Sequence, residues 1–123
     1  MVILIVDGDL HRQRQLKTVL SSLGLKTATI ECASDFKSAI TVLRQTRFDC
    51  CFVAANEARE ETIAFLNEVR QGPIGKSLTI IAYSPSATRE DVVAAVDAGA
   101  DTFLAYPFTP ENVEQALNKV RPR

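Results

Sequence analysis

The chain has 123 residues, of which 46% are hydrophobic and 24% charged, a composition typical of a single globular domain. Its formal net charge of -1 provides no electrostatic attraction to nucleic acid or to an anionic membrane surface. No apolar segment approaches the roughly 18 residues that a membrane span requires, and no secretory signal is recognisable at the amino end. We therefore expect one cytoplasmic domain over residues 1–123 that binds neither nucleic acid nor membrane.

The cysteine and histidine content argues against a metal centre or a catalytic triad. Cys32, Cys50 and Cys51 form no CxxC pair, so we interpret all three as small buried hydrophobic residues. His11 is the only histidine, which leaves little support for a histidine-rich metal site or a Ser-His-Asp triad.

Apolar runs alternate with helical spacing along the first half of the chain. Val2–Val6 is an apolar, largely β-branched run, which predicts a central strand buried on both faces. A helix follows, with Asp9 as its N-cap and Gly24 as its end. Residues 27–30 predict a weaker strand, and a second helix is expected after a Ser34 cap. The apolar positions at helical spacing in these two helices are Leu16, Val19, Leu20, Leu23, Phe36, Ala39, Ile40 and Leu43.

The alternation continues in the second half. The third helix is expected to end before Gly72, and the fourth to end at Gly99 with Val96 facing the core. Thr109 and Pro110 open the last helix as a cap and a proline in the first turn. The remaining strands are expected at residues 50–55, 78–82 and 102–105. Further positions expected to face the core are Ile63, Phe65, Leu66, Val69, Val92, Ala95, Val113, Ala116, Leu117 and Val120.

Five strands alternating with five helices predict an α/β fold with a doubly wound, five-stranded parallel sheet. We expect the flavodoxin-like strand order 2-1-3-4-5, in which ligands bind beyond the carboxyl ends of the strands. Functional residues are therefore expected in the loops at residues 7–9, 54–58, 83–87 and 105–108.

Four motifs at characteristic separations identify a family. They are Ile5-Val6-Asp7 closing the first strand, Phe48-Asp49 before the third, Ala98-Gly99-Ala100-Asp101 before the fifth, and Tyr106-Pro107-Phe108 after it. With these motifs the whole chain resembles the receiver domains of response regulators. The resemblance implies the receiver fold and a phosphoryl transfer from a histidine kinase to an aspartate at the end of the third strand, assisted by Mg²⁺.

Several residues that this chemistry requires are replaced. The resemblance aligns Asp7 with the first of two metal-binding acids, but Gly8 occupies the second acid position. Ala54 stands at the phosphoacceptor position, and a methyl group cannot accept a phosphoryl group. Asn56 stands where the family offers a main-chain carbonyl to the metal, and it cannot make a site by itself. We therefore expect Mg²⁺ binding to be weak or absent, with no other cofactor.

The other side of the pocket is also altered. Ser84 keeps the hydroxyl that the family uses at the end of the fourth strand, whereas Tyr106 replaces the family's lysine. We interpret the site as a neutral, hydrogen-bonded pocket in which the Tyr106 hydroxyl donates to Asp7. Asp9 is interpreted as a helix cap, with a pocket-facing side chain as the alternative.

Two further features have more than one interpretation. Phe103 aligns with the family's switch aromatic, but without a phosphoryl group we expect a fixed ring; the family's cis proline implies a cis bond before Pro107. The basic cluster of the first helix is interpreted as a solvated face, with a docking surface for an acidic partner as the alternative. Its members are His11, Arg12, Arg14 and Lys17.

The resulting hypothesis is a degenerate receiver that is no enzyme and that signals through protein contacts without phosphorylation. The partner is a histidine kinase, an output domain of a longer regulator that this domain would begin, or a second copy. The expected interaction face, formed by the fourth helix, fifth strand and fifth helix, includes Arg89, Glu90, Asp97, Glu114 and Asn118. Two alternatives remain: a phosphoacceptor that uses a displaced acid, and a sensor that binds a small ligand near Ser84 and Tyr106. For the displaced acid, Asp9 and Glu57 lie in the right loops, whereas Asp49 lies at the wrong end of the third strand.

Overall fold

The computed structural model describes residues 1–25, 28–55, 59–72, 75, 77–85 and 88–120. Its strands are β1 (Val2–Val6), β2 (Thr29–Ala33), β3 (Cys50–Ala54), β4 (Thr79–Ser84) and β5 (Thr102–Ala105). Its helices are α1 (Leu10–Ser22), α2 (Phe36–Gln45), α3 (Arg59–Gln71), α4 (Arg89–Ala98) and α5 (Pro110–Leu117). All strand pairs are parallel and the sheet has the order β2-β1-β3-β4-β5, which confirms the predicted fold class and topology.

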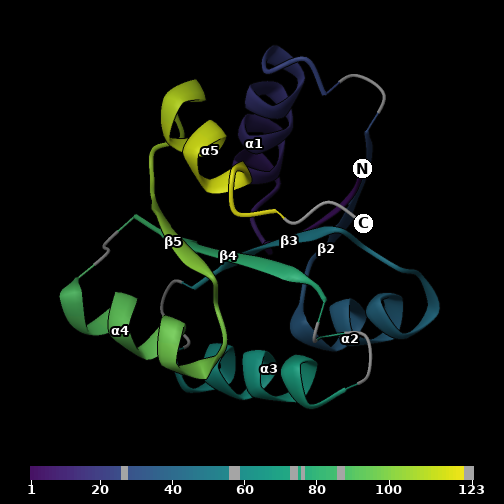
Figure 1. The fold of residues 1–123 in the computed structure, drawn as a ribbon, viewed down its shortest axis with the longest axis vertical. Coiled ribbons are helices and arrows are strands. Elements are labelled where there is room, and N and C mark those ends of the chain that lie inside the picture. Colours follow the sequence, from purple (N-terminus) through teal and green to yellow (C-terminus); the bar gives the residue numbers. More distant parts are fainter. Residues whose placement is uncertain (26–27, 56–58, 73–74, 76, 86–87, 121–123) are drawn as a thin grey trace.

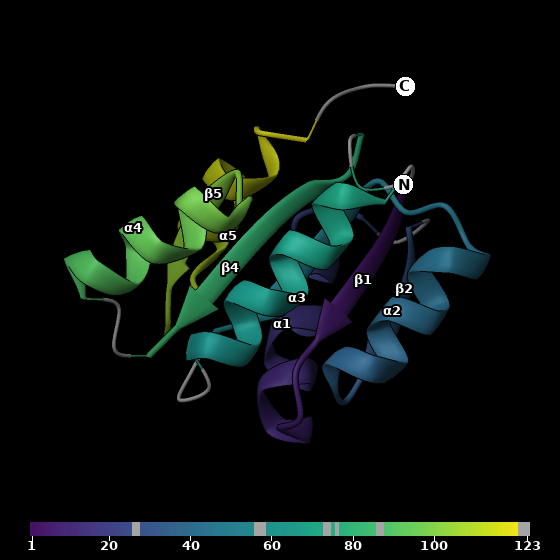
Figure 2. The same ribbon diagram turned by 90° about the horizontal axis from the view of Figure 1, so that it is seen from below.

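The sheet is covered by helices on both faces. α1 and α5 lie on one face, and α2, α3 and α4 lie on the other (Figure 1). Figure 2 shows the second layer in front of the sheet, with the three helices side by side. Because both faces are covered, β1 and β3 carry apolar residues at every position and divide them between two cores. The parallel arrangement brings the carboxyl ends of β1, β3 and β4 to one edge of the sheet.

Three expectations about the elements are wrong. The second strand begins at Thr29 and pairs along its length with β1, whereas Ala28 precedes it and residue 27 lies outside the described part. β2 is an edge strand with alternating burial, so its apolar residues are not contiguous. The cap of α2 is Asp35, whose carboxylate accepts a hydrogen bond from the Ser38 amide at 2.7 Å. Val96 is 45% exposed because the small residues of α4 face the sheet.

Other local predictions are confirmed. Asp9 caps α1, and Gly99 ends α4 with a φ of 131°. Thr109 opens α5 through a reciprocal capping box. The bond between Tyr106 and Pro107 is cis. None of the helices in the described part of the chain has the length and apolar character needed to cross a membrane.

The cysteines are unpaired and differ in burial. Cys50 and Cys51 are buried as predicted, whereas Cys32 on the edge strand is only half-buried. Burial raises the pKa of Cys51 to about 12 and raises that of Cys50 as well. Both thiols therefore stay protonated near neutral pH, as expected of small hydrophobic core residues.

Candidate functional site

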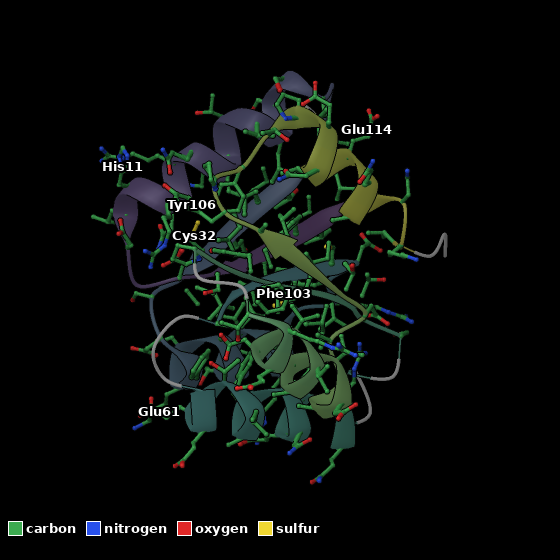
Figure 3. All side chains as sticks on the ribbon, turned by 90° about the vertical axis from the view of Figure 1, so that its left-hand side faces the viewer. His11, Cys32, Glu61, Phe103, Tyr106 and Glu114 are labelled. Atoms are coloured by element: carbon green, nitrogen blue, oxygen red, sulfur yellow. The ribbon has the colours of Figure 1, made fainter. Side chains whose placement is uncertain are left out.

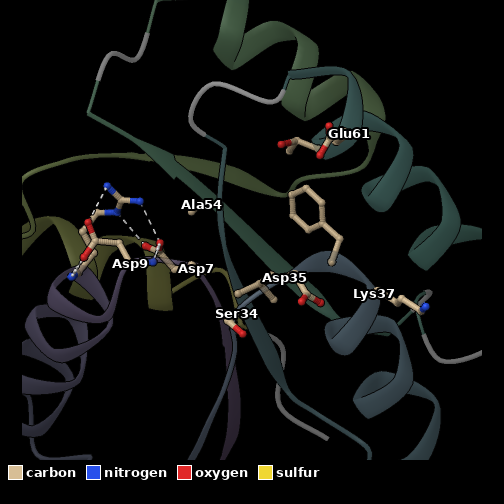
Figure 4. A pocket seen from close by; sticks show the side chains of 12 residues that line it. Asp7, Asp9, Ser34, Asp35, Lys37, Ala54 and Glu61 are labelled. Atoms are coloured by element: carbon tan, nitrogen blue, oxygen red, sulfur yellow. Dashed lines mark hydrogen bonds and ion pairs between the residues drawn. The ribbon is translucent and has the colours of Figure 1, made fainter.

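A hollow of about 680 Å³ opens at the carboxyl edge of the sheet. Its wall is built from the ends of β1 and β3 and from the first turns of α1, α2 and α3 (Figure 4). The lining residues are Val6, Asp7, Gly8, Asp9, Arg12, Ser34, Asp35, Phe36, Lys37, Ala54, Glu61 and Thr62. Four of the predicted pocket residues, at positions 7, 8, 9 and 54, are therefore brought together.

Asp7 is the centre of the site. It is only 2% exposed, and both of its carboxylate oxygens are hydrogen-bonded. Arg12 binds it through two parallel contacts, Nε to Oδ2 at 2.9 Å and Nη2 to Oδ1 at 3.0 Å. The Tyr83 hydroxyl donates to Oδ2 at 2.7 Å, and the Asp9 amide donates to Oδ1 at 2.9 Å. Each oxygen thus accepts two hydrogen bonds from groups of the chain itself.

Arg12 supplies the positive charge that contacts Asp7. Its guanidinium also lies 3.4 Å from Asp9 Oδ2, and its side chain is 20% exposed. The hydrogen bonds to Asp7 raise the pKa of Arg12 above its already high ordinary value, so it is cationic at any physiological pH. The interpretation of Arg12 as part of a solvated basic face is therefore wrong. Arg14, Lys17 and His11 are exposed as that interpretation requires, and Figure 3 shows His11 on the outer side of α1.

Asp9 has a structural role at the start of α1. Its Oδ1 accepts hydrogen bonds from the amides of His11 at 2.8 Å and Arg12 at 3.3 Å. The hydrogen bond from the Arg12 amide lowers the pKa of Asp9 below its ordinary value. By fixing the first turn of α1, Asp9 directs the Arg12 side chain back toward Asp7.

The predicted hydrogen bond from Tyr106 to Asp7 is wrong. Tyr106 donates instead to Gln15 Oε1 at 2.5 Å, on the α1 side of the molecule (Figure 3). Tyr83, which is fully buried, is the tyrosine that reaches Asp7. Burial and the hydrogen bond to Asp7 hold the pKa of Tyr83 well above its usual range, so the phenol remains a donor. The pocket is therefore built around an ion pair, and the expectation of a neutral pocket is corrected.

The remaining predicted residues lie around this centre in different ways. Ala54 lines the hollow beside Asp7 (Figure 4), whereas Ser84 is buried at the end of β4 and does not line it. Asn56 lies outside the described residues. Gly8 is exposed, and a side-chain Cβ at this position would lie 3.2 Å from the Ser34 carbonyl oxygen.

Of the acids considered as alternative phosphoacceptors, those within the described residues are occupied or distant. Asp9 caps α1, as described above. Asp49 precedes β3 at the opposite edge of the sheet and accepts a hydrogen bond from the Val2 amide at 2.7 Å. Glu57 lies outside the described residues. Glu61, which the sequence analysis did not select, lines the hollow from the first turn of α3 (Figure 4).

The predicted interaction face is exposed. Arg89, Glu90, Asp97, Glu114 and Asn118 all have exposed side chains on α4 and at α5. Two apolar residues of α4 are exposed among them: Val93 at 49% and Val96 at 45%. Phe103, at the predicted switch position, is partly buried and packs against the core on the α2–α4 side of the sheet.

A 2-1-3-4-5 parallel sheet with an aspartate-centred hollow at its carboxyl edge and a cis proline after β5 defines a receiver-type signalling domain. The model of the response regulator receiver domain matches residues 3–118, and the chain belongs to that family. It is thus a receiver domain of two-component signalling, a class of signalling modules that interact with proteins such as histidine kinases and output domains.

Relatives and solved structures agree with this assignment. The chemotaxis protein CheY of Pseudomonas aeruginosa is 30% identical over 120 residues, which cover 98% of this chain and 95% of that protein. A putative response regulator from Chloroflexus aurantiacus has a TM-score of 0.83 at 26% identity, with 95% and 94% of the two chains covered. The receiver domain of a Pseudomonas aeruginosa sensor histidine kinase has a TM-score of 0.82 at 23% identity, with 97% and 95% covered, and holds a magnesium ion in its active-site cleft.

The residues of this chain do not suit such a magnesium ion. Mg²⁺ requires several oxygen ligands in near-octahedral geometry. Both Asp7 oxygens are already bound by hydrogen-bond donors, and Gly8 and Ala54 contribute no side-chain oxygen. In the part of the chain that the structure describes, no group of three His, Cys, Asp or Glu side chains is placed to hold a metal ion.

Proposed function

We propose that this receiver domain is a degenerate one that signals without phosphorylation, as a protein-interaction module. One observation carries the proposal: Arg12 and Tyr83 bind the carboxylate of Asp7, beside Ala54 in the wall of the hollow. The family resemblance places Ala54 at the phosphoacceptor position. A phosphoryl group would need an acceptor oxygen and a cation to offset its charge. Beside Asp7, the site offers the methyl group of Ala54 and the Arg12 cation, which is already paired.

The proposed output surface is the exposed face of α4, β5 and α5. Val93 and Val96 provide apolar contact area, and the charged residues Arg89, Glu90 and Asp97 surround them. An apolar centre with a polar rim is the usual composition of a protein-binding surface. The partner is a histidine kinase, an output domain or a second copy of the chain, and the domain over residues 1–123 either acts alone or begins a longer cytoplasmic regulator.

The decisive experiment is the intact mass after incubation with a small-molecule phosphodonor and Mg²⁺. The positive control is the CheY protein of Pseudomonas aeruginosa under the same conditions, provided that it takes up the phosphoryl group. We expect no phosphoryl mass on this chain. If the mass increases, the proposal fails, and peptide mapping then identifies the acceptor among the acids at the hollow, with Glu61 and Asp9 as the first candidates.

The interaction surface has a separate test. Val93→Asp places a charge in the centre of the proposed surface and should weaken binding to a partner recovered by pull-down at least tenfold. Thr41→Asp, an exposed change on α2, is the matched control and should leave binding unchanged. If the two substitutions change partner binding equally, α4 is not part of the binding surface. Sedimentation velocity of the wild type at increasing concentration tests the second copy as the partner.

A further inference from the structure

We infer that Arg12 is a built-in cation of the receiver site, held where it excludes Mg²⁺, so that the pocket carries its own counter-charge. The inference rests on the proposed function, because a site that works without phosphorylation has no need for an exchangeable metal. It gives Arg12 a role inside the site, whereas the sequence had predicted that this side chain belongs to a solvent-exposed basic face.

The first argument is the occupancy of Asp7. A metal ion could bind this carboxylate only after displacing the two guanidinium contacts at 2.9 and 3.0 Å, the Tyr83 hydroxyl or the Asp9 amide. The bidentate geometry is the strongest that arginine forms with a carboxylate. The pair is also largely shielded from water, since the Asp7 side chain is fully buried and that of Arg12 only 20% exposed.

The second argument is charge. Asp7 and Asp9 both contact the guanidinium, so one positive charge lies between two carboxylates. A divalent cation entering beside Arg12 would meet a fixed positive charge only a few ångströms away. Gly8 and Ala54 contribute no carboxylate beside Asp7 to offset that repulsion. The other acids that line the hollow are Asp35, which caps α2, and Glu61 in the first turn of α3.

The third argument is preorganisation. The Asp9 carboxylate accepts a hydrogen bond from the Arg12 amide and forms an ion pair with the Arg12 guanidinium. The backbone and the side chain of one residue are therefore fixed by the same cap. Gln13 strengthens the arrangement, since its side-chain amide donates to the Asp7 carbonyl at 2.5 Å. Little additional ordering is required of Arg12, which favours the internal cation over one from solution.

A consequence distinguishes this inference from a merely structural ion pair. Removal of the guanidinium leaves the carboxylates of Asp7 and Asp9, at the wall of the hollow, without the cation that both of them contact. Their combined charge should then attract a divalent cation weakly. The internal cation and Mg²⁺ are thus predicted to be mutually exclusive occupants, and a structural ion pair would show no such exchange.

The experiment compares melting temperatures in 10 mM MgCl₂ and in NaCl of equal ionic strength. Wild type and Arg14→Ala, an exposed arginine of the same helix, should show no difference between the two salts. Arg12→Ala should melt roughly 3–6 °C higher in MgCl₂ for a dissociation constant of about 1 mM. The double variant Arg12→Ala with Asp7→Asn should lose that gain. Mn²⁺ should broaden the backbone NMR signals of residues 7–9 in Arg12→Ala and leave those of the wild type sharp.

Every outcome decides the matter. The inference is overturned if the wild type binds Mg²⁺ with a saturable rise in melting temperature, or if a folded Arg12→Ala shows no response. If Arg12→Ala does not fold, Arg12→Gln and the wild-type Mn²⁺ spectrum replace it, and broadening at residues 7–9 in the wild type contradicts the inference. If the inference about Arg12 fails, the proposed function still stands as long as no phosphoryl mass appears. Phosphoryl uptake overturns the proposed function, whatever the Mg²⁺ titration shows.

Discussion

Two arginines bind aspartates at opposite edges of the sheet, and they do so in different ways. At the carboxyl edge, the Arg12 guanidinium pairs, among the described residues, with the carboxylates of Asp7 and Asp9. At the amino edge, Arg70 of α3 pairs with Asp101 at 2.8 Å and also donates to three main-chain carbonyls. Arg12 neutralises a buried carboxylate, whereas Arg70 cross-links the connections before β4 and β5 through hydrogen bonds.

The Arg70 cluster explains one of the family motifs in structural terms. The carbonyls that it binds belong to Gly75, Leu78 and Gly99, which lie on the connections before β4 and β5. Asp101, the last residue of the Ala-Gly-Ala-Asp tract, also accepts a hydrogen bond from the Ile80 amide at 2.8 Å. The tract therefore serves the packing of the amino edge, and its presence alone does not indicate a working phosphorylation site at the other edge.

The largest loss of stability is expected from Arg12→Ala. It leaves the fully buried Asp7 carboxylate without its cation, and breaking such a pair should lower the free energy of unfolding by about 3 kcal/mol. Arg14→Ala, the matched control, should change it by less than about 0.5 kcal/mol. Urea denaturation measures both values. Equal values for the two variants would mean that Arg12 does not balance buried charge.

Arg70→Ala should have the second-largest effect and lower the free energy of unfolding by about 2 kcal/mol. It removes the hydrogen bonds that Arg70 donates to three carbonyls, and water can replace part of those hydrogen bonds. Urea denaturation provides the measurement, and Arg70→Lys is the informative companion. Lysine keeps the charge but not the planar fork, so it should recover little stability. Full recovery by lysine would make the cluster an ordinary ion pair, and the contrast with Arg12 would disappear.

Tyr83→Phe tests the neutral donor of the Arg12 site. It removes one hydrogen bond to a buried carboxylate and should cost about 1.5 kcal/mol. Tyr106→Phe is matched in chemistry but removes a half-buried hydrogen bond to Gln15, so it should cost less than about 1 kcal/mol. Thermal denaturation of both variants gives the comparison. A greater loss in Tyr106→Phe would restore that tyrosine as the main donor of the site.

The last prediction is a dependence on alkaline pH, which leaves the stability near neutral pH unchanged. Burial raises the pKa of Cys51 from 9.0 to about 12 and that of Tyr83 well above 10.0, so the unfolded chain loses these protons first. Stability should be complete below pH 9 and fall as the pH rises above that, by about 1.4 kcal/mol per pH unit for each group.

Single variants separate the two groups. Urea denaturation between pH 8 and 11 should show a shallower decline for Cys51→Ala from pH 9 upward and for Tyr83→Phe only above pH 10. Unchanged slopes in both variants would show that neither buried group controls the alkaline limit.

The sequence was sufficient for the topology because β1 and β3 are wholly apolar and the helices between strands have regular apolar spacing. It was misleading at β2 and at Val96, where burial depends on position at the edge of the sheet or in the outer helix layer. Those are properties of the assembled layers, and no local pattern of residue types contains them.

The location of the site was predicted from the sequence, but the contacts of its residues were not. Asp7, Gly8 and Ala54 follow from strand ends, yet the identity of the partner of Asp7 depends on side-chain direction at the start of α1. One signal was available: a buried carboxylate without a metal requires a cation, and Arg12 is the arginine in the first turn of the following helix. Tyr83 had no such signal, because tyrosine in a buried strand is equally compatible with a simple core position.

The close approach of Gly8 to the Ser34 carbonyl has a consequence for substitutions at position 8. Any side chain there would place its Cβ 3.2 Å from that oxygen, so the loop before α2 must shift slightly to admit an acid. Under the proposed function, an engineered phosphoacceptor would need this shift, a carboxylate in place of Ala54 and the release of Arg12 from Asp7. Each change alone adds crowding or uncompensated charge. A single substitution is therefore not expected to convert the hollow into a phosphorylation site.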